Sequence, residues 1–247
     1  MAVHRIRTVD LCKRYKDITA VTDLNLTIHP GEVFCFLGPN GAGKSTTIKM
    51  LTGILRPTSG QVHINGIDML GNSKKAKAAI GYVPEEPFLY DKLTGMEMLQ
   101  VHGKLYGLSP VYIRQQGGAL LDRFGLLGAH RRLVGEYSHG MKQRLMFSMA
   151  LLHDPDILIV DEPLVGLDPA GAKLVKDLLA TLARDEEKTI FMSTHTLSVA
   201  EEVGDTVGII HNGRMIACDT IDILKREYDL EHQTLESLFL QITAGRG

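Results

Sequence analysis

Cysteine is scarce in this 247-residue sequence, and neither sign of charge dominates it. The three cysteines show no CxxC spacing, and Cys35 lies in the apolar stretch VFCFLG, where a buried core thiol is a better interpretation than a metal ligand. This usage fits a reducing compartment. The formal net charge of −2 lacks the basic excess of a dedicated nucleic-acid-binding protein, so we predict no nucleic-acid partner.

Long apolar runs are also missing. The first ten residues, MAVHRIRTVD, lack the apolar core of a signal peptide, and no run approaches the ~18 to 20 apolar residues that span a bilayer. No internal repeat, low-complexity segment or long linker interrupts the chain. We therefore expect a single domain over residues 1–247 that does not cross a membrane by itself.

The composition is that of a globular protein, with 44% hydrophobic and 23% charged residues. Apolar strand-like segments alternate with helix-like ones, which predicts an α/β fold with a mainly parallel sheet covered on both faces. Two Asn-Gly pairs flanked by apolar alternation, Asn65-Gly66 and Asn212-Gly213, predict hairpins and therefore an antiparallel portion. The predicted strands are EVFCFLG (32–38), AIGYV (79–83), DILIVDE (156–162) and TIFMSTH (189–195).

Strand signals fade between about residues 87 and 154. There the segment DKLTGMEMLQVHGKLYGL places Thr94 and Glu97 at capping-box spacing and continues with apolar residues at helical intervals. This stretch predicts an α-helical subdomain inserted into the α/β core. A C-terminal helical tail is expected over about residues 220–247, with an apolar stripe formed by Leu235, Leu238, Phe239 and Ile242.

The segment GPNGAGKST fits the pattern GxxxxGK[ST] and lies between a predicted strand and a predicted helix. Its glycines let the backbone wrap around an anion, and its amides and the helix N-terminus supply partial positive charge. Lys44 would reach the β- and γ-phosphates, and Ser45 would offer a hydroxyl to Mg²⁺. The segment therefore predicts a P-loop NTPase core whose triphosphate-binding residues are Gly38, Pro39, Asn40, Gly41, Ala42, Gly43, Lys44, Ser45 and Thr46.

Two carboxylates follow the apolar run ILIV, as expected where a buried strand ends at the ligand-binding edge of a parallel sheet. Asp161 suits the Mg²⁺ shell, and Glu162 suits a general base or a water-orienting role in hydrolysis. His195 ends the next apolar strand and would approach the γ-phosphate at the same edge. A purely structural histidine is the alternative interpretation of His195.

The segment YSHGMKQR (137–144) places an open Ser-x-Gly turn before an apolar helix. Together with the preceding motifs it resembles the signature segment of the nucleotide-binding subunits of ABC ATPases, and the resemblance covers about Val3 to Ile242. That family has a RecA-like core and holds two ATP molecules in a head-to-tail dimer. The resemblance implies that the turn contacts ATP on the partner subunit; His139 and Met141 depart from the common LSGGQ signature. The predicted trans-contact and interface residues are Ser138, His139, Gly140, Met141 and Asp168.

Other roles follow from the same resemblance. Tyr15 matches the aromatic residue that stacks on adenine, and a core or surface tyrosine is the alternative. Asp168 matches a loop that crosses the dimer interface, and with Pro169 it also forms an N-cap and N1 pair. GYVPEEP stands where the family has a Gln that serves Mg²⁺ and the attacking water, so Glu85 is the predicted catalytic and metal-site residue, with Glu86 as the alternative.

Three functions differ in class. The first is an ATP-hydrolysing energy-coupling subunit of an ABC transporter, bound to a separate permease at the cytoplasmic face of the cell membrane and working as a homodimer or with a paired ATPase. The second is a soluble ABC ATPase that remodels a cytosolic assembly, and the third is an ABC factor for DNA or ribosomes. The resemblance favours the first, with ATP and Mg²⁺ as cofactors and export as its direction; the transported substrate is not encoded in this chain.

Overall fold

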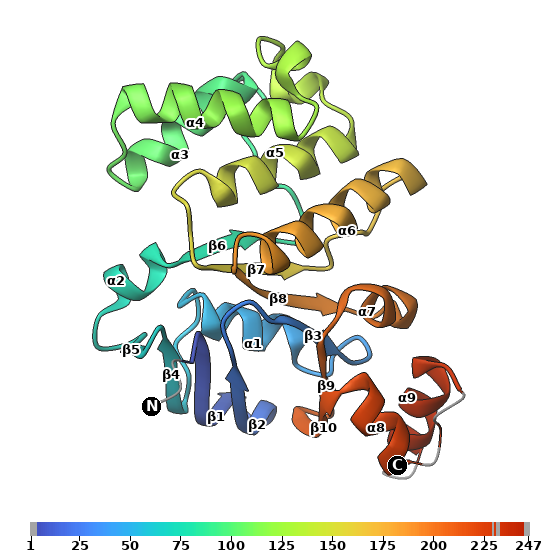
Figure 1. The fold of residues 1–247 in the computed structure, drawn as a ribbon. Helices are drawn as coiled ribbons and strands as arrows, with labels where there is room; N and C mark the ends of the chain where they lie inside the picture. The colour runs from blue at the N-terminus through green and yellow to red at the C-terminus, as the bar shows by residue number, and fades with distance from the viewer. Residues whose placement is uncertain (1–3, 229, 231–232, 245–247) are drawn as a thin grey trace.

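A six-stranded sheet separates two layers of the molecule (Figure 1). The structure is a computed structural model that describes residues 4–228, 230 and 233–244 of the chain. The strand order is β10-β9-β3-β8-β7-β6, and neighbouring strands are parallel except for the β9–β10 pair. The four strands predicted from apolar runs are confirmed within this sheet. The strands are β3 (Val33–Leu37), β6 (Ile80–Val83), β7 (Ile157–Asp161), β8 (Thr189–Thr194), β9 (Thr206–His211) and β10 (Arg214–Thr220).

A second sheet is antiparallel, with the order β2-β1-β4-β5. Both predicted Asn-Gly hairpins are confirmed, joining β4 to β5 and β9 to β10. Their turn residues all have positive φ, 49° and 74° at Asn65-Gly66 and 47° and 75° at Asn212-Gly213, which suits turns that follow the twist of the strands. The strands are β1 (Ile6–Tyr15), β2 (Ile18–Ile28), β4 (Ser59–Ile64) and β5 (Ile67–Asp68).

The longest hairpin, formed by β1 and β2, was not among the predicted elements. It pairs Ile6 with Ile28 at one end and Tyr15 with Ile18 at the other. Its two-residue turn, Lys16-Asp17, contains no glycine, and Lys16 itself adopts the left-handed conformation at φ 49°. The usual glycine marker of a hairpin is therefore absent from this part of the sequence.

Helix α1 (Lys44–Leu51) lies between the two sheets. Successive side chains of the six-stranded sheet point to opposite faces, so they contribute to two separate hydrophobic cores. Phe34 and Phe36 pack on the α1 side with Phe191, at ring-centroid distances of 5.5 Å. Cys35 points to the opposite side, where helices α6 (Pro169–Arg184) and α7 (Leu197–Val203) cover the sheet. Cys35 is fully buried, as predicted, and burial raises the pKa of its thiol to about 12.

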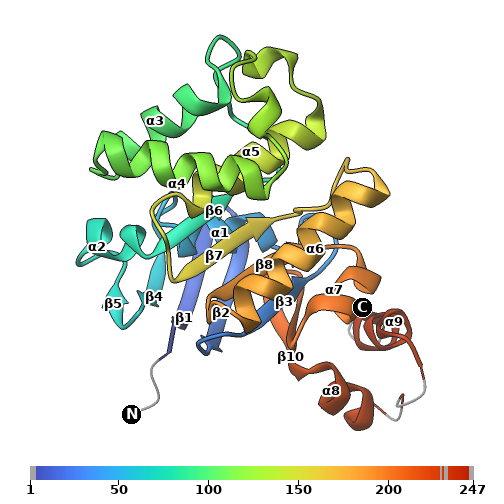
Figure 2. The same ribbon diagram turned by 45° about the horizontal axis from the view of Figure 1, so that its top comes forward.

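Helices fill the chain between β6 and β7, two strands that are neighbours in the sheet. They form the layer farthest from the antiparallel sheet (Figures 1 and 2). The predicted capping box is confirmed, because Thr94 accepts a hydrogen bond from the Glu97 amide and the Glu97 carboxylate accepts one from the Thr94 amide. The elements are α3 (Gly95–Leu105), α4 (Pro110–Arg123), the short 3₁₀ turns Leu127–Ala129 and Val134–Glu136, and α5 (His139–Leu151); α2 (Ser73–Ala78) precedes β6.

The C-terminal segment contains α8 (Ile221–Glu227) and α9 (Leu235–Ala244). Leu235, Leu238 and Ile242 are buried, and α9 lies against α7 and α8, so the apolar stripe of the tail packs on the domain. Residues 1–3, 229, 231–232 and 245–247 of the predicted domain and tail lie outside the described residues. In the described ranges, none of the helices combines the length and apolar character that a membrane crossing requires.

Candidate active site

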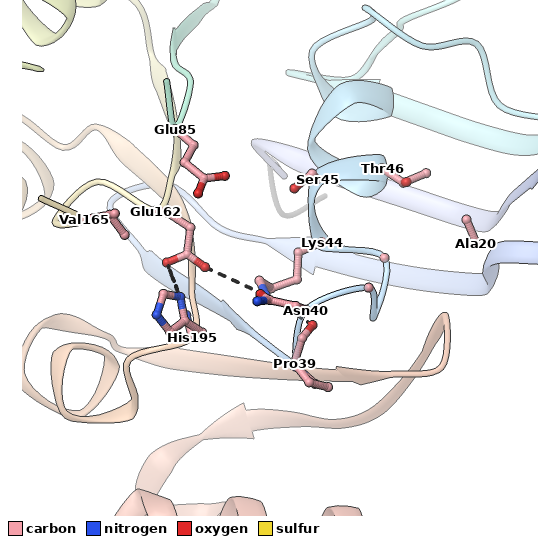
Figure 3. A pocket seen from close by; sticks show the side chains of 12 residues that line it. Ala20, Pro39, Asn40, Lys44, Ser45, Thr46, Glu85, Glu162, Val165 and His195 are labelled. Atoms are coloured by element: carbon pink, nitrogen blue, oxygen red, sulfur yellow. Dashed lines mark hydrogen bonds and ion pairs between the residues drawn. The ribbon is translucent and has the colours of Figure 1, made fainter. Parts of the chain in front are cut away.

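The glycine-rich loop connects the end of β3 to the first residue of α1. Gly43 is the N-cap of α1 with φ 112°, and a Cβ at this position would stand 2.6 Å from the Ala20 carbonyl oxygen. Both the backbone angle and the lack of space therefore require glycine at Gly43. The loop leaves a cleft above it, shown in Figure 3.

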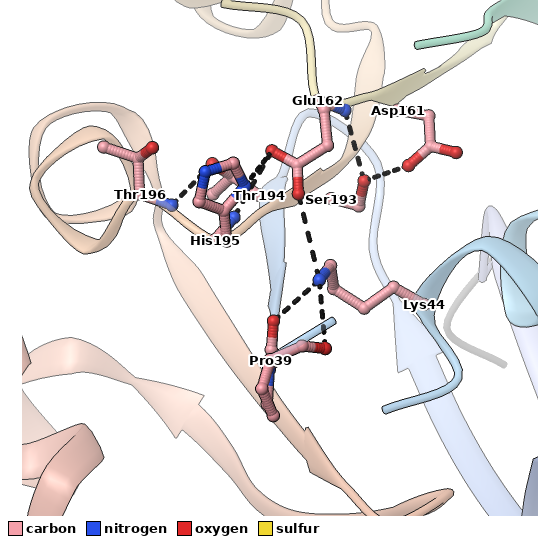
Figure 4. A network of polar contacts seen from close by, with 9 residues as sticks. Pro39, Lys44, Asp161, Glu162, Ser193, Thr194, His195 and Thr196 are labelled. Carbon is pink, nitrogen blue, oxygen red and sulfur yellow. Dashed lines mark hydrogen bonds and ion pairs between the residues drawn. The ribbon is translucent and has the colours of Figure 1, made fainter. Parts of the chain in front are cut away.

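Lys44 is nearly enclosed, with 7% of its surface exposed. Its Nζ donates to the carbonyl oxygens of Gly38 at 2.6 Å and Pro39 at 3.4 Å, and lies 3.8 Å from Glu162 Oε1 (Figure 4). A buried ammonium group requires such partners, because desolvation without hydrogen bonds is costly. The loop's own carbonyls thus hold the cation beside the cleft, within reach of a bound anion.

Asp161 and Glu162 stand at the carboxyl end of β7 and are both buried. The Ser193 hydroxyl on β8 donates to Asp161 Oδ1 at 2.5 Å and accepts from the Glu162 amide at 3.2 Å. Burial raises the pKa of Asp161 above its ordinary value, and the hydrogen bond from Ser193 opposes that rise. Ser193 therefore holds the carboxylate of Asp161 and the backbone of Glu162, a role that was not predicted.

The Glu162 carboxylate lies between two nitrogen groups. Its Oε2 is 2.9 Å from His195 Nδ1 and accepts a longer hydrogen bond from the His195 amide, while Oε1 faces Lys44 (Figure 4). The Glu162 backbone is left-handed, with φ 48°, an unfavourable conformation for a residue with a Cβ. The structure thus brings Lys44, Glu162 and His195 together, as predicted for one edge of the sheet.

Glu85 lines the same cleft from the loop that follows β6, whereas its neighbour Glu86 does not. Mg²⁺ usually keeps few protein ligands, one or two carboxylates or hydroxyls, together with substrate phosphates and water. The donors Ser45, Asp161 and Glu85 fit that pattern, although within the described ranges no set of three or more His, Cys, Asp or Glu side chains could hold an ion. The cleft is lined by Ala20, Pro39, Asn40, Gly41, Gly43, Lys44, Ser45, Thr46, Glu85, Glu162, Val165 and His195.

Tyr15 is placed outside this cleft lining. It ends β1 with 44% of its surface exposed, and Lys13 Nζ lies 5.2 Å from the centre of its ring. An exposed aromatic face at this position is compatible with a base platform, so adenine stacking stays a prediction.

The predicted signature turn lies at a separate hollow, which shares no lining residue with the cleft. Ser138 caps α5 by accepting the Met141 amide at 3.3 Å, and Asp168 caps α6 by accepting the Gly171 amide at 2.7 Å. Ser138, His139, Gly140 and Asp168 all line the hollow, whereas Met141 is half-buried and packs against the core instead. The structure therefore brings four of the five predicted trans-contact residues to one surface.

Arg144 also lines the hollow and was missed by the sequence analysis. Its guanidinium donates to the carbonyl oxygens of Gly140 at 3.2 Å and Phe124 at 2.9 Å, and so fixes the turn to the end of α4. Arg144 lies one helical turn after Gly140, and this spacing is the available sequence signal for it. Ser193 has no such local signal, because it and Asp161 lie on different strands, 32 positions apart in the sequence.

A glycine-rich loop between β3 and α1, with paired carboxylates at the end of β7, a parallel strand separated from β3 by β8, defines a P-loop nucleoside triphosphatase. Comparison with known proteins narrows the class, since a family model described as ABC transporter matches residues 21–165. The bacitracin transport ATP-binding protein BcrA of Bacillus licheniformis is 42% identical over 221 residues, covering 90% of this chain and 71% of that protein.

Two solved structures agree with this result. The structure of an ATP-binding subunit of an ABC transporter has a TM-score of 0.89 and 33% identity, covering 96% of this chain and 99% of that one. A dimeric ATP-binding cassette in a post-hydrolysis state, bound to ADP and Pi, has a TM-score of 0.80 and 25% identity, covering 87% and 98%. The chain belongs to the ABC transporter family, as an energy-coupling subunit that binds and hydrolyses ATP.

Proposed function

We propose that this chain powers an exporter by closing as a head-to-tail dimer on two ATP molecules. The observation that carries the proposal is the separation of the Lys44 cleft from the Ser138 hollow within one chain. An open Ser-x-Gly turn at a helix N-terminus offers amides, a hydroxyl and a favourable dipole to phosphate, but this turn is not beside the chain's own P-loop. A second subunit would bring the two half-sites together.

The proposed chemistry assigns one task to each cleft residue. Lys44 and the loop amides bind the β- and γ-phosphates, and Glu162 accepts a proton from the attacking water while His195 orients the carboxylate and faces the γ-phosphate. Ser45, Asp161 and Glu85 would hold Mg²⁺, which would neutralise charge on the phosphates when bound. Tyr15 would stack on adenine.

The permease would dock near Glu85–Thr94, the segment that joins the cleft to the helical layer. Phe88 and Tyr90 are 80% and 68% exposed there, which supplies apolar surface for a helix of the membrane subunit. We place the working protein at the cytoplasmic face of the cell membrane through that permease. Export is part of the proposal, and the similarity to a bacitracin transport protein supports a transport role over the cytosolic remodelling function.

Recovery of partners from membranes tests the transporter assignment. The tagged chain is recovered from a mild-detergent membrane extract of its host and, in parallel, from the soluble fraction, with partners identified by mass spectrometry. A multi-span protein in stoichiometric amount is expected from membranes. A soluble assembly, with nothing enriched from membranes, would move the function to cytosolic remodelling and leave the ATPase chemistry in place.

The closed dimer has a separate test. Glu162→Gln protein with ATP and Mg²⁺ should run at twice the monomer mass, and adding Ser138→Arg should return it to the monomer, because a long cation then fills the hollow. Ser109→Arg is the matched control, since Ser109 caps α4 in the same way, by accepting the Tyr112 amide, but lies away from the hollow. Monomeric Glu162→Gln protein under all conditions would contradict the proposed dimer.

A further inference from the structure

His139 stands where the common signature has a glycine, and its side chain makes a defined contact. It is the first residue of α5, and its Nε2 lies 3.2 Å from the Val165 carbonyl oxygen, which leaves Nε2–H as the donor. Val165 lies 26 positions later, in the loop between β7 and α6. The contact therefore joins the signature turn to a loop that is distant in sequence.

The imidazole of His139 packs directly against Gly166. A Cβ on Gly166 would stand 2.9 Å from His139 Nε2 and 3.0 Å from its Cδ2, closer than side chains pack. Gly166 also has φ 75°, so glycine suits both the backbone angle and the ring beside it. The histidine and the glycine thus form one packed contact and one hydrogen bond.

The loop that His139 holds borders both half-sites. Val165 lines the P-loop cleft, whereas Gly166 and Asp168 line the hollow together with His139. The Val165 amide donates to the Glu162 carbonyl oxygen at 3.3 Å, so hydrogen bonds run from the turn through Val165 to the backbone of Glu162. A path of hydrogen bonds therefore leads from the turn to the loop that follows Glu162.

We propose that His139 is a positioning residue that ties the Ser138 turn to the loop Val165–Asp168 and so couples the two half-sites of one subunit. The coupling rests on the proposed function, because the hollow acts in hydrolysis only when a partner's nucleotide enters it. The tie itself, the contact of His139 with Val165 and Gly166, lies within a single chain. Nε2–H donates in both the neutral and the protonated ring, so the tie does not require a charged histidine.

Three variants of the full chain test the proposal. His139→Ala removes the donor and the ring, and His139→Gln keeps an N–H donor of similar reach. His63→Ala is the matched control, because His63 lies on β4 and lines neither half-site. Hydrogen exchange of residues 165–168 is measured without nucleotide, and kcat and KM for ATP are measured with Mg²⁺.

In His139→Ala protein, exchange of the loop should be about two- to tenfold faster, which is the range that loss of one hydrogen bond produces. The kcat should fall by a similar factor with little change in KM, His139→Gln should restore both quantities, and His63→Ala should change neither. Unchanged loop exchange in His139→Ala protein, or no recovery in His139→Gln protein, would overturn the tie. Faster exchange with unchanged kcat would overturn the coupling.

These outcomes are separable from failure of the proposed function. Loop exchange is measured on the nucleotide-free chain and does not depend on dimer formation. A Glu162→Gln protein that stays monomeric with ATP would refute the dimer while leaving the exchange result as the test of the tie. If His139 served only to contact nucleotide on the partner subunit, His139→Ala would leave hydrogen exchange of residues 165–168 unchanged in the chain without nucleotide.

Discussion

Because the backbone of Glu162 is left-handed, we expect the glycine variant at this position to be more stable than the alanine variant, the reverse of the usual order. At an ordinary position glycine destabilises a protein by about 0.5 to 1 kcal/mol relative to alanine, because it loses more conformational entropy on folding. At φ 48° alanine retains the Cβ clash, which costs about 1 to 2 kcal/mol and which glycine avoids. From the midpoints of the two ranges, Glu162→Gly should be more stable than Glu162→Ala by about 0.75 kcal/mol.

Both substitutions remove the carboxylate, so the contacts to His195 and Lys44 cancel in the comparison. The free energy of unfolding is measured by urea titration without nucleotide, and equal m-values ensure that the same surface is exposed. Asp177→Ala and Asp177→Gly, at an exposed position within α6, form the control pair, and there glycine should be less stable by about 1 kcal/mol. Alanine more stable than glycine at both positions would refute strain at Glu162.

Three further outcomes follow from the cleft. Glu162→Gln should lower ATP turnover by about 10² to 10⁴-fold, the usual contribution of a general base, while equilibrium ATP binding persists; wild-type turnover would exclude the base assignment. Asp161→Asn should stabilise the nucleotide-free protein at neutral pH. Burial raises the pKa of Asp161, so the folded wild type favours the protonated carboxyl and loses stability as pH rises through that raised pKa, whereas asparagine stays neutral. In thermal melts with EDTA, the stability advantage of Asp161→Asn over the wild type should shrink as pH falls toward 3.8, the ordinary pKa of an aspartate. An advantage that stays constant with pH would contradict a raised pKa at Asp161. Glu85→Gln should change the Mg²⁺ concentration that gives half-maximal turnover, and an unchanged Mg²⁺ titration together with unchanged turnover would remove Glu85 from the metal site.

Part of the site could be predicted because its chemistry lies in consecutive residues. A loop of nine residues between a strand and a helix carries its own backbone amides, glycines and lysine, so its composition indicates phosphate binding without knowledge of the rest of the chain. The four strands of the parallel sheet were recognisable as continuous apolar runs, since strands buried on both faces lack polar positions. The β1–β2 hairpin was missed because its turn, Lys16-Asp17, carries no glycine.

By itself, the sequence determined the class of protein, the glycine-rich loop between strand and helix, and the pair of carboxylates at the end of a buried strand, because short contiguous patterns encode local backbone geometry. Only the tertiary structure decided that Ser193 supports Asp161, that His139 reaches Val165 and that the Ser138 turn lies away from the chain's own P-loop. The two contacts join residues 32 and 26 positions apart, and their geometry depends on strand order and helix packing. Such relations arise when a parallel sheet brings separate strand ends to one edge, and no local spacing in the chain records them.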